Sequence, residues 1–129
     1  MKRSPFGVEK RERSRAEAEV AVAFERLLNL HRLDYWHPYT AQRSQPGFPD
    51  YAVFGDGWIG FVELKARSTT TGRMGKVSDA QERYKASIEA GGGEWRVFKL
   101  PDEWHDVDVY LNGHTGKGIW DSGAEEARR

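Results

Sequence analysis

The spacing of apolar side chains predicts a helix near the start of the chain. Between residues 14 and 32, apolar positions recur every three or four residues, which is the spacing of one face of an α-helix. We therefore expect an amphipathic helix over residues 14–32. Its apolar face carries Val20, Phe24, Leu27, Leu28 and His31.

One acidic residue lies on this apolar face. Glu17 precedes Phe24 by seven residues, which places the two side chains about 20° apart around the helix axis. Glu19 projects to the far side. Ser14 can cap the helix, and Glu17 then occupies the capping-box position three residues later. A carboxylate that points into a functional site explains Glu17 equally well, and the helix alone leaves both explanations open.

Strand patterns follow the helix. Residues 34–40 (DYWHPYT) are rich in aromatic side chains and predict a first strand, which ends in a polar loop. Residues 56–57 are Asp-Gly, the preferred dipeptide of a two-residue type I′ hairpin turn. If that turn forms, Gly55 opposes Trp58 and the numbers of paired residues sum to 113. A one-residue change of turn would invert the faces.

Three charged side chains occupy this hairpin where apolar ones are expected. Glu63 and Lys65 share one strand face, because successive side chains alternate, and the register places Asp50 opposite Glu63. Facing carboxylates repel, and buried charges are costly unless they are paired or bound to metal. A hard cation such as Mg²⁺, which prefers carboxylate and carbonyl oxygens, reverses that repulsion. The pattern indicates a metal-dependent phosphodiesterase site.

The next segment is typical of a loop and then of a helix. Residues 66–77 are small, polar and basic, without an acidic residue. They do not form a Walker A motif, because Thr70 occupies the first glycine position and Val77 follows Lys76, so we expect no nucleotide cofactor. Ser78 begins a helix that reaches about residue 90, and Gln81 occupies its capping-box position.

The rest of the chain completes one α/β domain. Residues 94–100 (EWRVFKL) predict a last strand, and the spacing beyond Pro101 suits either a helix or a strand. The order α-β-β-β-α-β predicts a mixed sheet flanked by helices. We expect a basic N-terminal arm over residues 1–13, the domain over 14–112 and a loosely ordered tail over 113–129.

Charge and composition limit the kinds of partner and metal site that the protein can have. The formal net charge is zero, but residues 1–16 carry six basic and two acidic side chains, a net of 6 − 2 = +4. Such an arm is compatible with a polyanionic partner, although charged termini are usually only solvated. The chain has no cysteine, which excludes disulfides and thiolate metal sites. It shows neither a signal peptide nor a transmembrane run, so we expect a cytoplasmic protein without a membrane partner.

Five motifs together carry a resemblance to a known family. Pro49-Asp50, twelve residues and then Glu63-Leu64-Lys65 resemble the signature of the PD-(D/E)XK nuclease superfamily. More narrowly, the chain resembles the virus-type replication-repair nuclease (VRR-NUC) domain over about residues 14–100. The matching elements, in family order, are a first-helix glutamate most like Glu17, GFPD at 47–50, FVELKA at 61–66, Ser-x-x-Gln at 78–81 and WRVFKL at 95–100.

The resemblance implies a restriction-endonuclease-like core and a Mg²⁺- or Mn²⁺-dependent DNA endonuclease. Asp50, Glu63, the Leu64 carbonyl and Glu17 would hold the metal, Lys65 would be catalytic, and Gln81 would belong to the active site rather than only cap its helix. Small members of the family resemble phage or prophage enzymes of the bacterial cytoplasm. Some resemble Holliday-junction resolvases, which implies a homodimer that cleaves branched DNA.

Two further alternatives remain open. The chain could be a restriction-type nuclease or the nuclease subunit of a larger complex, and it could also be a catalytically silent nucleic-acid-binding module. The basic loop that follows Lys65 predicts DNA contacts by Arg67, Arg73 and Lys76, although most basic loops are only solvated.

Overall fold

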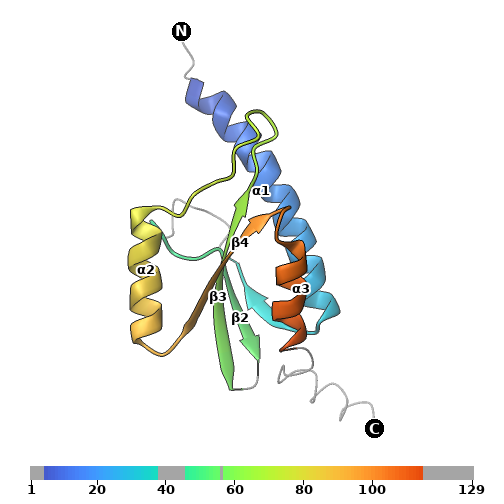
Figure 1. The fold of residues 1–129 in the computed structure, drawn as a ribbon, viewed down its shortest axis with the longest axis vertical. Coiled ribbons are helices and arrows are strands. Elements are labelled where there is room, and N and C mark those ends of the chain that lie inside the picture. The colour runs from blue at the N-terminus through green and yellow to red at the C-terminus, as the bar shows by residue number, and fades with distance from the viewer. Residues whose placement is uncertain (1–4, 38–45, 56, 115–129) are drawn as a thin grey trace.

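A four-stranded mixed sheet with helices on both faces forms the centre of the molecule (Figure 1). The computed structural model describes residues 5–37, 46–55 and 57–114. The elements follow the predicted order, and one helix is added at the end. They are α1 (Pro5–Leu30), β1 (Asp34–Trp36), β2 (Tyr51–Gly55), β3 (Trp58–Ala66), α2 (Asp79–Ala90), β4 (Glu94–Leu100) and α3 (Trp104–Asn112).

The strands lie in the order β1-β2-β3-β4. The first three pair antiparallel, and β4 pairs parallel with β3. A parallel neighbour needs a crossover connection, which here contains α2. Figure 1 shows α2 on one side of the sheet and α1 and α3 on the other. The prediction of an α/β fold with a mixed sheet is therefore confirmed.

The predicted hairpin register is also confirmed. Gly55 pairs with Trp58 and Tyr51 pairs with Val62, so the paired residue numbers sum to 113 as expected. Gly57 has φ +74°, a value that glycine adopts without steric cost. Asp56, the other predicted turn residue, lies outside the described residues.

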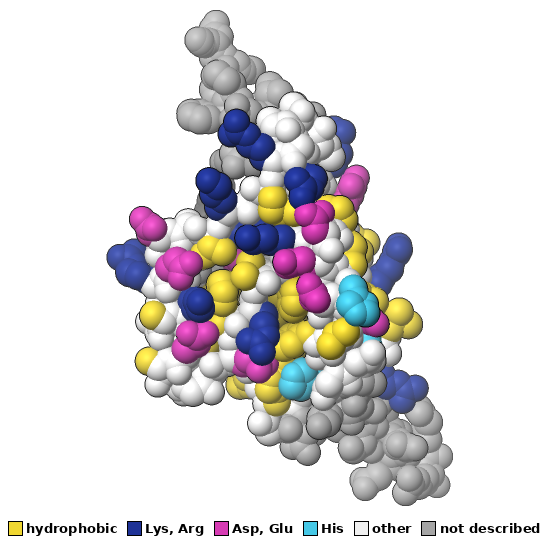
Figure 2. Space-filling view, in the orientation of Figure 1, with side chains coloured by type: hydrophobic (Ala, Val, Ile, Leu, Met, Phe, Trp, Pro, Cys, Tyr) yellow, Lys and Arg dark blue, Asp and Glu magenta, His cyan; other side chains and the backbone are white. Residues whose placement is uncertain are grey.

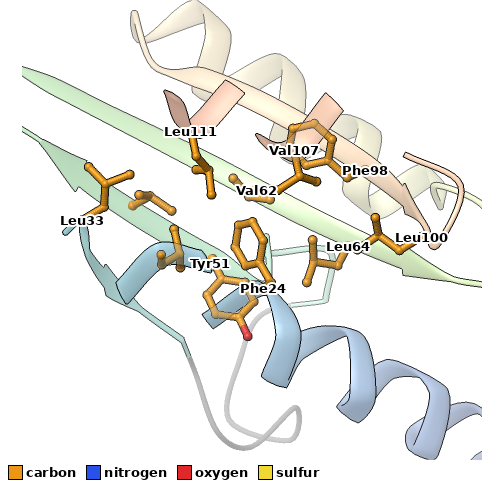
Figure 3. Close-up of a cluster of buried hydrophobic side chains, with 11 residues drawn as sticks. Phe24, Leu33, Tyr51, Val62, Leu64, Phe98, Leu100, Val107 and Leu111 are labelled. Atoms are coloured by element: carbon orange, nitrogen blue, oxygen red, sulfur yellow. The ribbon is translucent and has the colours of Figure 1, made fainter. Parts of the chain in front are cut away.

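The apolar core lies between the sheet and the pair α1 and α3 (Figure 3). Val62 and Leu64 from β3 belong to the same cluster as Phe24 from α1 and Leu111 from α3. Burying each such side chain stabilises the fold by about 2 kcal/mol. Because strand side chains alternate, the burial of Val62 and Leu64 on this face directs Glu63 and Lys65 to the opposite face.

The first helix begins earlier than predicted. It starts at Pro5 rather than at Ser14. Proline suits the first turn of a helix, and the Glu, Lys and Arg residues that follow have good helix propensity, so the charged segment is helical. Ser14 consequently lies inside the helix, and the capping-box explanation of Glu17 is wrong. The predicted arm boundary at residue 13 likewise falls within α1.

The remaining boundaries show where the sequence pattern was ambiguous. The first strand ends at Trp36, and residues 38–45 lie outside the described residues. Beyond Pro101 the chain forms a helix, in which Val107 and Leu111 are buried and Val109 is exposed. Of the predicted tail, residues 115–129 lie outside the described residues. No helix in the described part of the chain has an apolar stretch long enough to cross a membrane.

Candidate active site

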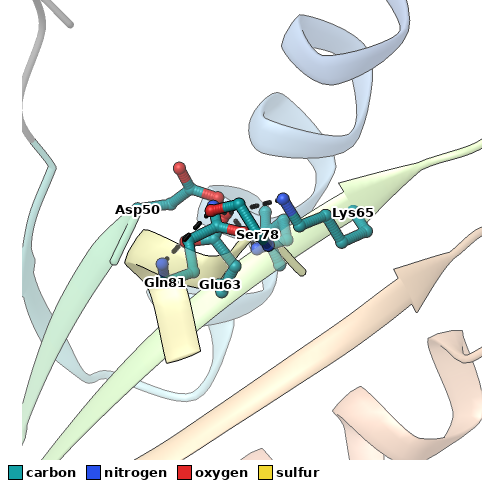
Figure 4. A network of polar contacts seen from close by, with 6 residues as sticks. Asp50, Glu63, Lys65, Ser78 and Gln81 are labelled. Carbon is teal, nitrogen blue, oxygen red and sulfur yellow. Dashed lines mark hydrogen bonds and ion pairs between the residues drawn. The ribbon is translucent and has the colours of Figure 1, made fainter. Parts of the chain in front are cut away.

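Asp50, Glu63 and Lys65 converge on the sheet face that is turned toward α2 (Figure 4). The ladder between β2 and β3 ends at the pair Tyr51 and Val62. Asp50 follows immediately beyond that pair, so it lies across from Glu63 as the sequence predicted. Glu63 and Lys65 are two residues apart on β3 and share one face.

Because the ladder ends before Leu64, its N–H and carbonyl do not pair with the backbone of β2. The Leu64 N–H donates a hydrogen bond of 2.8 Å to Oδ2 of Asp50. In the ladder register Leu64 would face Pro49, which has no N–H to offer the Leu64 carbonyl. The N–H and carbonyl of a residue in an antiparallel strand point to the same neighbouring strand, so the Leu64 carbonyl also points toward Asp50.

The Glu63 carboxylate is buried and only half satisfied. Its residue is 4% exposed. Oε2 accepts a hydrogen bond of 2.6 Å from Nε2 of Gln81 and lies 3.3 Å from Nζ of Lys65. Oε1 is buried without a hydrogen-bond partner. A buried carboxylate oxygen without a partner is costly, so Glu63 has the geometry of a ligand that faces a cation.

Gln81 performs both of the roles that its position suggests. The Ser78 N–H donates to Oε1 of Gln81 (2.8 Å), and the Gln81 N–H donates to Oγ of Ser78 (3.2 Å), which completes the capping box of α2. The same side-chain amide donates through Nε2 to Glu63. Because the cap holds the amide oxygen, its nitrogen is directed at the carboxylate.

Gly47 allows the segment before Asp50 to pack against α2. Its φ is +91°, and a Cβ placed there would lie 2.5 Å from the backbone carbonyl of Ala80. Both the left-handed backbone and the lack of space therefore require glycine at this position. The first turn of α2, which carries Gln81, is thereby held beside Asp50.

The electrostatics of the site favour a bound cation. Burial, together with the neighbouring charge of Asp50, raises the pKa of Glu63 to about 8, against the lowering effect of Lys65. Burial also raises the pKa of Asp50, against the lowering effects of the Leu64 N–H and Lys65. Both carboxyls resist ionisation because they are buried, and a divalent ion would stabilise them as anions.

The donor set fits such an ion. Asp50, Glu63 and the Leu64 carbonyl would hold Mg²⁺ or Mn²⁺, with water and phosphate oxygens as the remaining ligands, an arrangement that Mg²⁺ commonly adopts. Within the described ranges no group of three or more His, Asp or Glu side chains is placed to hold a metal. The protein ligands that the described residues would offer such an ion are therefore two carboxylates and a carbonyl.

The structure does not bring Glu17 into this pair of carboxylates. Its side chain is exposed, whereas its neighbour Ala16 is buried. The sequence placed Glu17 on the helical stripe of Phe24, but Phe24 is fully buried and Glu17 is not. Figure 1 shows that the N-terminal part of α1 projects beyond the body of the domain. Glu19 is exposed as well.

The basic loop after β3 is held together by its own hydrogen bonds. The Ser68 N–H donates to the Arg73 carbonyl (2.8 Å), and Arg67 forms an isolated bridge with Met74. The Arg67 guanidinium pairs with Asp102 and donates to the Gly72 carbonyl, so it stabilises the loop. Arg73 and Lys76 are exposed. In Figure 2, basic side chains gather on the upper part of the molecule, which contains this loop.

The structure adds a chain of contacts that supports Asp50 and that the sequence did not predict. Nδ1 of His37 lies 2.8 Å from the Asp50 carbonyl, which can only accept, so this nitrogen carries the proton. The His37 ring stacks on Tyr51 at 4.3 Å, and the Tyr51 hydroxyl donates to Glu25 of α1 at 2.6 Å. This chain fixes the backbone at Asp50. No local spacing signals it, because His37 and Asp50 are thirteen residues apart.

Comparison of the chain with protein-family models, with curated proteins and with solved structures finds no match.

Proposed function

We propose that this protein is a divalent-metal-dependent DNA endonuclease that hydrolyses phosphodiester bonds and prefers branched DNA. One observation carries the proposal. The buried carboxylate of Glu63 faces Asp50 across the end of a ladder, with one oxygen unpartnered and a lysine on the other. The sequence resemblance to the VRR-NUC domain, with its restriction-endonuclease-like core, supports the same activity.

The residues of the chain have distinct roles in this proposal. Asp50 and Glu63 provide the negative charge that holds the cation, and the Leu64 N–H fixes the orientation of Asp50. Gln81 keeps Glu63 in place through its capped amide. The Lys65 ammonium, 3.3 Å from Glu63, orients the attacking water and stabilises the negative charge that develops on the phosphate.

The cation supplies the remaining chemistry. When bound, Mg²⁺ or Mn²⁺ lowers the pKa of water, aligns the phosphodiester and offsets its developing charge. Glu17 belongs to the proposal only as an accessory acidic group, because it is exposed and lies outside the carboxylate pair.

The broader context is proposed from the resemblance. A homodimer would present two such sites to a branched substrate, as symmetric resolution of a four-way junction requires. We propose a phage- or prophage-encoded enzyme that acts in the cytoplasm of a bacterial host.

A substrate panel tests the activity. Purified protein is incubated with linear duplex, single-stranded, flap, splayed and four-way DNA in Mg²⁺, Mn²⁺ or EDTA. We expect cleavage of the branched forms with either metal and none in EDTA. Glu63→Gln should be inactive, whereas Asp79→Asn, which removes an exposed acid at the start of α2, should retain wild-type activity.

The alternatives give different results. Binding of DNA without cleavage under every metal condition would identify a silent binding module. Cleavage only of a particular duplex sequence would favour a restriction-type enzyme. Metal-dependent cleavage that survives Glu63→Gln would show that the reaction occurs elsewhere on the protein.

A further inference from the structure

Four aromatic side chains form a surface beside the candidate active site. They are Trp36, Phe48, Phe61 and Tyr84, and together they are called the aromatic surface below. Phe48 is central, because its ring meets the other three edge to face at centroid distances of 6.2 Å, 6.3 Å and 5.5 Å. The four residues come from β1, the segment before β2, β3 and α2, so only the folded chain brings them together.

The aromatic surface lies on the same sheet face as the carboxylates. Phe61 is two residues from Glu63 on β3 and therefore points the same way. Trp36 pairs with Ala52, which is two residues from Asp50. Asp50 lies two residues along the chain from Ala52, and Trp36 lies on the neighbouring strand. The Cα atoms of Trp36 and Asp50 are therefore about 8 Å apart. One nucleotide of an extended DNA strand can bridge that span.

Trp36 presents an accessible ring on a fixed support. It is 52% exposed, whereas Phe48, Phe61 and Tyr84 are half-buried. Beyond Phe61 the apolar face continues into a cavity of about 670 Å³ at the C-terminal end of α2, and its lining residues carry no charge. An exposed ring that is held by its neighbours loses little freedom when a ligand binds.

We propose that the aromatic surface stacks against an unpaired nucleobase of the DNA strand whose phosphate lies at Asp50, Glu63 and Lys65. Nucleobases stack readily on aromatic side chains. In a continuous duplex the bases are stacked inside the helix and cannot reach a ring at this distance from the phosphate. The aromatic surface therefore selects DNA with an unpaired nucleotide next to the scissile phosphate, which deepens the proposed nuclease function and rests on it.

The charges on this face fit a nucleic acid better than a second copy of the chain. Lys99 pairs with Lys65 across β3 and β4, so both point to this face and can attract phosphates. A stable interface between copies covers about 800 Å² on each partner. Centred on Trp36, such an interface would also cover Asp50 and close the candidate active site.

Binding measured without metal separates this inference from catalysis. Fluorescence anisotropy in EDTA compares a labelled single-stranded oligonucleotide with the matching duplex. We expect Trp36→Ala to weaken single-strand binding about tenfold and to leave duplex binding unchanged. Trp36→Phe, which keeps a ring, should retain most of the affinity. Val109→Ala, at an exposed apolar position of α3, is the matched control and should change neither affinity.

Other results of these binding measurements would contradict the inference or separate it from the nuclease activity. Equal single-strand affinity of Trp36→Ala and wild type overturns the inference, and so does a wild type that does not bind single strands. If Trp36→Ala instead dissociates a dimer in sedimentation and weakens both DNA forms equally, the surface is an interface between copies and the inference is wrong. Trp36-dependent single-strand binding by a protein that cleaves nothing would support the inference and refute the nuclease activity.

Discussion

Among single residues, Lys65 and Lys99 form a matched pair. They face each other across β3 and β4, and Lys65 contacts the buried Glu63 whereas Lys99 is exposed. Lys65→Ala should therefore lower kcat by about a hundredfold or more, and Lys99→Ala should raise KM with little effect on kcat. Rates at saturating DNA and Mg²⁺ measure both. Retention of more than about a tenth of the wild-type kcat by Lys65→Ala would remove this lysine from the mechanism.

Glu63 makes the stability of the metal-free protein depend on pH. Burial raises its folded-state pKa to about 8, above the ordinary value of 4.5, so the folded protein holds this proton more tightly than the unfolded chain. Its contribution to stability is complete below the ordinary pKa and is lost as pH rises through the folded pKa. The melting temperature in EDTA should fall across that window, and Glu63→Gln should flatten the decline.

Mg²⁺ should compete with the proton for the Glu63 carboxylate. Because the carboxylates must ionise to bind metal, Mg²⁺ should raise the melting temperature more at about pH 8 than at about pH 6. In Asp50→Asn this stabilisation should be absent or much reduced. An equal effect of Mg²⁺ at both pH values would mean that the ion binds at another site.

At the scale of elements, the N-terminus of α2 serves both the fold and the site. Ser78→Ala removes a cap and should lower the free energy of unfolding by about 1 kcal/mol, with activity retained in the folded fraction. Gln81→Ala removes the other half of the capping box and also the hydrogen-bond donor to Glu63, so it should lower both stability and kcat. Denaturation curves and kcat separate the two effects. Equal kcat in both variants would restrict Gln81 to capping.

The first helix offers a second paired comparison. Ser14 lies within α1, so Glu17 has no capping role there, and its substitution should leave the melting temperature nearly unchanged. If Glu17 contributes to the proposed metal site, Glu17→Gln should weaken activity or its Mg²⁺ dependence, whereas Glu19→Gln should behave like wild type. Loss of activity in Glu19→Gln instead would reverse the assignment of helical faces.

For the whole molecule, local charge matters more than net charge. The formal net charge is zero, so attraction to DNA depends on groups such as Arg73 and Lys76 in the exposed loop after β3. Replacing both by alanine should weaken binding at low salt and reduce the salt-dependence slope by up to about two. Turnover at saturating DNA should change much less. An unchanged slope would make the loop a solvated surface feature.

The fold was predictable where the signals were local. The Asp-Gly turn predicted the hairpin register, and Ser78 predicted the start of α2. The pattern failed at the start of α1, because a charged segment carries no apolar period although its residues favour a helix. It was ambiguous for α3, where the packing of Val107 and Leu111 against the sheet decided in favour of a helix.

By itself the sequence determined which residues face one another across the hairpin, because turn chemistry and side-chain alternation act within a few residues. The sequence alone therefore predicted that Asp50, Glu63 and Lys65 lie together on one face of the sheet. Only the tertiary structure decided the burial of Glu63, the direction of the Gln81 amide, the support of Asp50 by His37 and the aromatic surface around Phe48. These contacts join residues far apart in the chain, so they depend on how helices and strands pack rather than on local backbone preference.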